Sequence, residues 1–181
     1  PNTCGKTNII EAISLLSNGK SFRTDKDAQM LKFGSEVGRV KGEVDGTILE
    51  VVLTAGEVGG EKAPTKKYLL NNVSKKRVDF VGNLSSVIFS PLDLGIIIGG
   101  PSVRRNFMDE FLEQVDFDYR VATTEYEKGI RQRNSLLEKV KNTRSAGSGQ
   151  AWRSSEFSYW DNLLITNGNI ITKKRAEFVE F

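Results

Sequence analysis

The beginning of this 181-residue chain constrains its fold and its chemistry more than any other stretch. Gly5-Lys6-Thr7 is the ending of the phosphate-binding pattern G-x-x-x-x-G-K-[ST], and apolar residues at helical spacing follow it from Ile9 to Leu16. Gly19, just behind them, predicts the C-cap of that helix. The order of loop and helix therefore indicates a nucleotide site at the N-terminus of a helix.

The residue types in this loop suit the binding of a nucleotide's phosphates. Backbone N–H groups at the positive end of a helix hold phosphates without a buried charged side chain. We expect the Lys6 ammonium to reach the β- and γ-phosphates and the Thr7 hydroxyl to bind a Mg²⁺ ion that bridges them. Asn2 and Thr3 are also available for phosphate contacts. The alternative is a chance Gly-Lys-Thr before an ordinary amphipathic helix.

The same pattern predicts an incomplete chain. Its first glycine would fall immediately before Pro1, no initiator Met stands at position 1, and Phe181 closes the chain within a predicted helix. We therefore expect the strand that feeds the loop to be missing. Cys4 is expected to be a small loop residue rather than a nucleophile, because the chain has no histidine to activate it.

Composition limits the remaining function classes. A hydrophobic fraction of 38% and a charged fraction of 27% suit a soluble protein with one sizeable core and an appendage. No segment reads as a transmembrane span or a signal peptide, so we expect no membrane association and a cytoplasmic location. A single Cys excludes an internal disulfide, and the absence of His removes the commonest metal ligand. Any metal is therefore expected to be a nucleotide-bound Mg²⁺.

The net charge of +3 and the pI near 9.0 permit nucleic acid as a partner without requiring it. The basic residues form small groups, each also consistent with a solvated face: Lys20, Arg23 and Lys26; Lys66 and Lys67; Lys75, Lys76 and Arg77; Arg104 and Arg105; Lys173, Lys174 and Arg175. Only convergence in space would make them a DNA-binding track.

Four of these cations are candidate DNA contacts. Lys20 and Arg23 directly follow the phosphate-loop helix, where they could touch either the nucleotide or a DNA backbone. Arg104 and Arg105 open a later helix, although the helix dipole favours negative charge there, so an anionic partner is expected. The alternative for this pair is an exposed intrahelical contact of Arg105 with Asp109.

The middle of the chain alternates between apolar and polar residues. Residues 36–54 predict an antiparallel pair of strands joined at Asp45-Gly46, and residues 55–65 predict a flexible loop. A strand at 68–70 with a tight turn at Asn71-Asn72 follows, then a short helix at 78–81 and a short apolar strand at 84–89 that ends at Ser90-Pro91.

Three further helices are predicted. The first begins at residues 99–102 and carries on one face Val103, Phe107, Met108, Phe111, Leu112 and Val115. The second covers 119–140 and its heptad seam is Tyr119, Ala122, Tyr126, Gly129, Arg133, Leu136 and Val140. A break at 142–150 precedes the third, whose seam is Phe157, Trp160, Leu164, Asn167, Ile171, Lys174, Phe178 and Phe181. The last two helices should form an antiparallel arm.

Taken together, the blocks resemble a known family, the bacterial RecF proteins of DNA replication and repair. The similar blocks lie in order along nearly all of the chain: 2–16, Gly19-Lys20-Ser21-Phe22-Arg23-Thr24, Phe89-Ser90-Pro91-Leu92-Asp93-Leu94, residues 100–109 and Gln132-Arg133-Asn134. A block such as Gly-x-Pro-x-x-Arg-Arg-x-Phe-x-Asp is far more specific than a phosphate loop alone.

The resemblance implies an α/β fold: a P-loop NTPase head of ABC and SMC type, with a mixed sheet and an antiparallel subdomain, over residues 1–115, and an antiparallel helical arm over 116–181. It also implies binding of single- and double-stranded DNA, and of ATP with Mg²⁺ at a loop formed by Pro1, Asn2, Thr3, Cys4, Gly5, Lys6 and Thr7. The resemblance further implies an ATP-dependent homodimer that works with RecO and RecR and has a nucleoid-associated location. Its implied roles are recombinase loading at gaps, replication restart and the SOS response. Asp93 would lie in a loop that senses the γ-phosphate.

The chain also departs from the family pattern. Nothing in residues 142–181 matches the family's Walker B acids or its Ser-x-Gly-Gln signature motif, so we expect weak ATPase activity only in a full-length dimer and negligible turnover here. Two alternatives stay open. One is an ATPase-coupled DNA nuclease of a related family, and the other is a nucleotide-binding dimerisation module that does not bind DNA.

Overall fold

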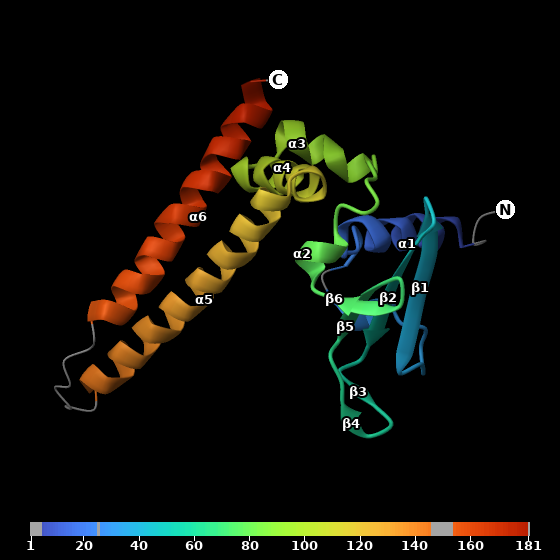
Figure 1. Cartoon of the computed structure of the whole chain (residues 1–181), viewed down its shortest axis with the longest axis horizontal. Coiled ribbons are helices and arrows are strands. Elements are labelled where there is room, and N and C mark those ends of the chain that lie inside the picture. The colour runs from blue at the N-terminus through green and yellow to red at the C-terminus, as the bar shows by residue number, and fades with distance from the viewer. Residues whose placement is uncertain (1–4, 25, 146–153, 181) are drawn as a thin grey trace. The chain divides into compact units, whose positions relative to one another are not determined.

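The chain divides into two compact units, Pro1–Val115 and Asp116–Phe181, and each is described here by itself. The structure is a computed structural model (Figure 1), and it describes residues 5–24, 26–145 and 154–180. The first unit combines an antiparallel sheet with helices and the second is helical. The predicted α/β class is therefore confirmed.

A four-stranded antiparallel sheet organises the first unit. Its strands are β1 (Val37–Val44), β2 (Thr47–Thr54), β5 (Lys66–Leu70) and β6 (Val73–Lys75), in the order β1-β2-β5-β6. The two predicted turns are confirmed. Asp45 and Gly46 have φ of 49° and 77°, and Asn71 and Asn72 have 49° and 64°. Two consecutive positive φ values fit the tight turns whose twist matches that of paired strands.

Helix α1 (Lys6–Asn18) covers one face of this sheet and closes the core. The predicted helix and its C-cap are confirmed, because Gly19 has φ of 68° and donates its N–H to the Leu15 carbonyl at 3.0 Å. The buried apolar side chains of the core are Leu15, Leu16, Leu49, Val51, Leu53 and Phe80. Strand β2 supplies three of them from alternate positions, as expected for a strand with one face buried.

Two predictions for the first unit were wrong in part. The predicted loop at 55–65 contains a small hairpin of β3 (Glu57–Val58) and β4 (Glu61–Lys62), because Gly59-Gly60 supplies the positive φ of a two-residue turn. The predicted strand at 84–89 is irregular. There the Ser86 N–H donates to the Gln114 side chain at 2.7 Å instead of to a neighbouring strand.

Five short or medium helices complete the first unit. They are η1 (Asp27–Met30), α2 (Arg77–Phe80), η2 (Pro91–Leu94), α3 (Gly95–Ile98) and α4 (Pro101–Val115). Helices α2 and α4 confirm their predictions. The predicted apolar face of α4 is wrong in part: Leu112 is buried, whereas Phe107 and Val115 are exposed and Glu113 and Gln114 are buried instead. Polar contacts accompany that burial, because Glu113 accepts from Arg77 and Gln114 accepts the Ser86 N–H.

The second unit is a pair of helices, α5 (Phe117–Ser145) and α6 (Ser154–Glu180). The predicted seam of α5 is confirmed, since Tyr119, Ala122 and Gly129 are buried. A Cβ on Gly129 would lie 2.9 Å from a Leu163 methyl group of α6, so the helices approach closely there. Helix α5 runs three residues past the start of the predicted break, and Phe181 lies outside the described residues.

The two helices of this unit run antiparallel, as predicted. At one end Arg133 donates to Asp161 at 2.6 Å, and at the other end Arg175 donates to the Tyr119 hydroxyl at 3.0 Å. Partners thus occur in opposite orders along α5 and α6. No helix within the described ranges combines the length and apolarity needed to cross a membrane.

Candidate nucleotide site

The N-terminal end of α1 carries the end of the predicted phosphate loop, and its first residues are exposed in the part of the chain that the structure describes. Gly5 is the N-cap, with φ of 76° and ψ of 11°, a left-handed conformation that favours glycine. Lys6 and Thr7 form the first helical turn, their residues are exposed, and that turn contains no acidic residue. Pro1, Asn2, Thr3 and Cys4 lie outside the described residues.

This helix end fits a phosphate with its Mg²⁺. The first-turn N–H groups of a helix have no intrahelical acceptor and carry a partial positive charge. A Cβ built on Gly5 would meet no atom of the described residues within 4 Å, so these residues leave room for a ligand to approach the backbone there. Lys6 would hold the phosphates as a point charge, and the Thr7 hydroxyl would be a Mg²⁺ ligand, which supplies charge neutralisation when bound.

The structure brings one predicted candidate, Arg23, beside this helix end. Its guanidinium lies 3.2 Å from a Glu11 carboxylate oxygen and 3.5 Å from the Asn8 side-chain oxygen. The Ser21 hydroxyl also donates to Glu11, so the connection after α1 folds back along the helix. Because Asn8 directly follows Thr7, Arg23 lies within about one helical turn of the phosphate loop.

A hollow of about 580 Å³ adjoins Arg23 in the same unit. Asn8, Glu11 and Arg23 line it from one side, and Arg39 and Val40 of β1 line it from another. Ligand pockets typically have volumes of about 300–1,000 Å³. The hollow is therefore large enough for the part of a nucleotide that extends away from the phosphates.

The C-terminal end of α1, in contrast, is held by donors from other elements. Arg77 donates twice to the Asn18 carbonyl, at 2.7 and 3.1 Å. Lys66 and the Tyr68 hydroxyl both donate to the Gly19 carbonyl, at 2.9 and 3.1 Å. These are carbonyls that the helix itself leaves unpaired, and cations are favourable at the negative end of its dipole.

Two ion pairs extend this arrangement. Arg77 contacts Glu113 of α4 at 2.7 Å, where the Glu113 side chain is only 9% exposed, and Lys66 contacts Asp27 at 2.6 Å. Burial raises the pKa of Tyr68 to about 12, although Arg77 opposes the shift. The Tyr68 hydroxyl therefore remains a donor throughout the physiological range.

Sequence reasoning missed these supporting residues. It grouped Lys66 and Arg77 with surface or DNA-facing cations, but the structure turns both toward the end of α1. Glu113 was not singled out at all. The C-cap Gly19 was a usable signal, because a helix end that is buried needs donors for its carbonyls.

The remaining DNA candidates do not converge. Arg104 donates to the Gly99 and Ile96 carbonyls at 3.1 and 3.4 Å, so the end of α3 supplies its negative partner. Lys20 lies 3.7 Å from Glu113. Glu113 is nine residues beyond Arg104 on α4, and nine residues of helix span about 13 Å, so Lys20 and Arg104 lie at different ends of this helix. Arg105 is exposed on the first turns of α4.

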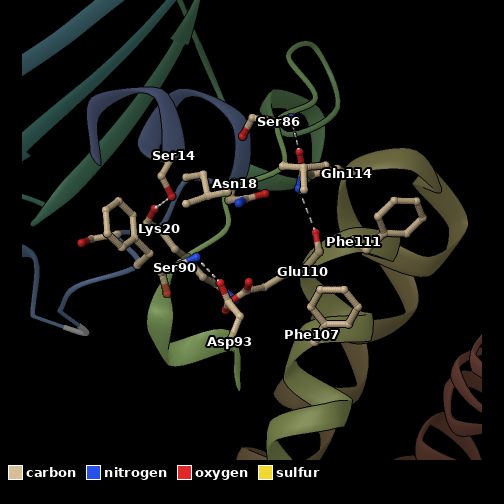
Figure 2. Close-up of a pocket in the computed structure, with 14 residues that line it drawn as sticks. Ser14, Asn18, Lys20, Ser86, Ser90, Asp93, Phe107, Glu110, Phe111 and Gln114 are labelled. Atoms are coloured by element: carbon tan, nitrogen blue, oxygen red, sulfur yellow. Dashed lines mark hydrogen bonds between the residues drawn. The ribbon is translucent and has the colours of Figure 1, made fainter. Parts of the chain in front are cut away.

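Asp93 lies away from the phosphate loop. Its carboxylate accepts the Ser90 N–H, and it lines a pocket at the C-terminal end of α1 together with Lys20 (Figure 2). Within the described part of the chain, no group of three or more Cys, Asp or Glu residues could hold a metal ion.

Comparison with known proteins identifies relatives along nearly the whole chain. No protein-family model matches it. It is 35% identical over 175 residues to the DNA replication and repair protein RecF of Leptospira interrogans serovar Lai, covering 97% of this chain and 45% of that protein. It is 36% identical over 180 residues to RecF of Lachnospira eligens, covering 99% and 47%.

Solved structures give the same result. Two structures of the recombination mediator protein RecF in the RecFOR pathway, one with ATP and one with ATPrS, superpose with TM-scores of 0.79 and 0.78. Each is 31% identical and covers 99% of this chain and 46% of the other.

The fold is an α/β fold that resembles the solved RecF structures, with an antiparallel sheet, a helix that follows the Gly5-Lys6-Thr7 sequence, and a helix pair. The chain belongs to the RecF family. It spans slightly less than half the length of the curated relatives that it matches.

Proposed function

We propose that this chain is the ATP-binding part of a RecF-type DNA repair protein. ATP binds at the loop that Pro1, Asn2, Thr3, Cys4, Gly5, Lys6 and Thr7 form, with Mg²⁺ on Thr7, and its occupancy controls DNA binding by the whole protein. The observation that carries the proposal is the exposed, acid-free first turn of α1 after a left-handed Gly5, in a chain similar to ATP-bound RecF. Residues 1–115 act as the ATPase head and 116–181 as its helical arm.

The residues divide the work by position. Lys6 and the first-turn N–H groups bind the phosphates, and Arg77, Lys66 and Tyr68 fix the other end of the same helix. A helix fixed at one end presents its free end in a set orientation, which reduces the ordering that binding would otherwise require. Arg23 lies close enough to serve the nucleotide, and Lys20, Arg104 and Arg105 remain the candidates for DNA.

The whole protein is proposed to follow the family. It forms an ATP-dependent homodimer, binds single- and double-stranded DNA, and works with RecO and RecR in loading recombinase at gaps, in replication restart and in the SOS response. It does so in the cytoplasm, associated with the nucleoid. Similarity to RecF favours this role over the nuclease and dimerisation alternatives, which no observation on the described residues favours.

Nucleotide binding is tested by titrating the protein with fluorescent Mg·ATP. Replacing Lys6 by Ala should weaken saturable binding at least tenfold, since a charge-assisted contact contributes roughly 1.5–3 kcal/mol. Lys62→Ala, an exposed lysine of β4 that lines neither pocket, is the control and should bind as the unchanged chain does. Binding that is indifferent to Lys6 would refute the proposal.

DNA binding and turnover have separate tests. Binding should weaken as salt rises, and Arg105→Ala should reduce the salt dependence if this residue contacts phosphate. If the whole protein bound no DNA, or bound it with no dependence on salt, the result would favour the alternative of a dimerisation module that does not bind DNA. Phosphate release by the present chain should stay at background, and hydrolysis that Lys6→Ala abolishes would contradict the expectation of negligible turnover.

A further inference from the structure

A second pocket lies at the end of α1 opposite the phosphate loop. It has a volume of about 110 Å³, and it is lined by the end of α1, residues 20–22, residues 86–88 with Ser90 and Asp93, and helix α4 (Figure 2). Helix α1 has 13 residues, which separates its two ends by roughly 18 Å. The pocket is therefore distinct from the nucleotide site.

The walls of this pocket combine aromatic and acceptor groups. Phe107 and Phe111 of α4 provide apolar surface, and Figure 2 shows both rings on the α4 side of the pocket. Asn18, Asp93 and Glu110 provide side-chain oxygens. Such a lining suits a ligand with an apolar part and hydrogen-bond donors.

One of these oxygens lacks a hydrogen-bond donor. The side-chain oxygen Oδ1 of Asn18 has almost no exposed surface, and no donor in the described part of the chain bonds to it. A buried acceptor without a donor is unfavourable, so native structures nearly always supply one. A donor entering from the pocket would satisfy it.

The charge around the pocket is negative. Glu110 experiences the like charges of Asp93, Glu113 and Asp109, whereas Lys20 is the cation that acts on it. Burial is the largest effect and raises the pKa of Glu110, and the three carboxylates raise it further. A cation in the pocket would relieve this repulsion.

The described residues favour an organic cation over a metal. They contain no group of three or more metal-ligating Cys, Asp or Glu residues. A guanidinium has a planar fork of five N–H donors and stacks on aromatic rings, so one group can meet a carboxylate and an amide oxygen together. An ammonium cannot match both features.

We propose that this pocket binds an alkylguanidinium, the chemistry of an arginine side chain. The guanidinium donates to the Glu110 carboxylate and to Asn18 Oδ1, and the alkyl stem lies against Phe107 and Phe111. This site goes beyond the proposed nucleotide and DNA functions and does not depend on them.

The test is a titration of the protein with ethylguanidinium, followed by backbone amide chemical shifts. Binding of a ligand this small should be about millimolar, with shifts concentrated around Asn18 and Glu110. Glu110→Gln should weaken it about tenfold, because a charge-assisted hydrogen bond is lost. Asn18→Ala should weaken it less, and it leaves the Asn18 carbonyl bonded to Arg77.

Two controls accompany the titration. Glu43→Gln, at an exposed position of β1, should leave binding unchanged, and neutral N-ethylurea should not bind at the same concentrations. Equal shifts from N-ethylurea, or ethylguanidinium binding that Glu110→Gln leaves intact, would overturn the proposal.

A second ligand distinguishes the sources of the guanidinium. If a short arginine-containing peptide binds more tightly than ethylguanidinium and with the same Glu110 dependence, the natural ligand is a protein side chain. If the two bind equally, a free guanidinium compound is sufficient. Both results support the pocket, and Mg·ATP should displace neither ligand.

Discussion

The two ends of α1 have similar backbone geometry but opposite surroundings. Gly5 and Gly19 flank the helix with φ of 76° and 68°, and both have ψ of 11°. A Cβ on Gly5 would meet no atom of the described part of the chain within 4 Å, whereas a Cβ on Gly19 would lie 2.9 Å from the Tyr68 ring. Among the described residues, the first end is exposed and the second is enclosed by side chains of β5 and α2.

This difference teaches where the helix derives its stability and where it can bind. At the C-terminal end, two cations and a tyrosine satisfy the carbonyls, which also suits the helix dipole. At the N-terminal end, the N–H groups have no acidic neighbour in the first turn. Substitutions at the enclosed end should therefore change folding stability, and substitutions at the exposed end should change ligand binding.

The largest effect should come from Arg77→Ala. The change leaves the nearly buried Glu113 and the Asn18 carbonyl without this partner, and breaking a buried pair in this way costs about 3–5 kcal/mol. Denaturant unfolding measures the loss. Arg131→Ala removes an exposed pair with Glu127 and should cost about 0–1 kcal/mol. Similar losses for both variants would show that the enclosed end is not a point of stability.

A pair of glycine substitutions compares the two ends directly. Gly5→Ala and Gly19→Ala both impose a left-handed conformation on alanine, which costs about 1–2 kcal/mol. Only Gly19→Ala also forces a clash with Tyr68, which should add about 1–3 kcal/mol. The free energies of unfolding of the two variants, measured under the same conditions, give this difference. Equal losses of stability would contradict the close approach of Tyr68 to Gly19.

Tyr68→Phe should cost about 1 kcal/mol near neutral pH, because the hydrogen bond to the Gly19 carbonyl is lost. The folded pKa of Tyr68 is raised to about 12 from 10.0, so its protonated form is favoured in the folded state. Its contribution is complete below about pH 10 and is lost as pH rises toward 12, at up to about 1.4 kcal/mol per pH unit.

Unfolding free energies of both proteins across pH 9–12 test this dependence. Subtracting the values for Tyr68→Phe from those for the unchanged chain removes the titration that the two share, including that of the lysines. The difference should fall between pH 10 and pH 12. A difference that stays constant would mean that Tyr68 titrates as it does in water.

The smallest stability effect should come from Lys6→Ala at the exposed end. Lys6 is exposed, and surface substitutions of this kind change the free energy of unfolding by less than about 0.5 kcal/mol. The same variant should lose Mg·ATP binding. A large loss of stability would show that Lys6 supports the fold rather than a ligand.

Local sequence determined several elements of this chain because their signals are complete within a few residues. Asp45-Gly46 and Asn71-Asn72 supply the positive φ values that two-residue turns require, and Gly19 supplies the same for the end of α1. The heptad spacing of α5 also predicted its buried positions, because two antiparallel helices that are adjacent in sequence pack along the residues that recur at this spacing. The Gly5-Lys6-Thr7 pattern likewise placed the candidate site at a helix N-terminus.

Only the tertiary structure decided how the charges are used. Lys66, Arg77 and Glu113 are far apart in sequence, and a basic group looks the same whether it faces water, DNA or a helix end. The segment 84–89 shows the same limit, because an apolar run becomes a strand only where a neighbouring strand accepts it. Backbone geometry is set by nearby residues, whereas the partner of a charge or of a strand is set by long-range packing.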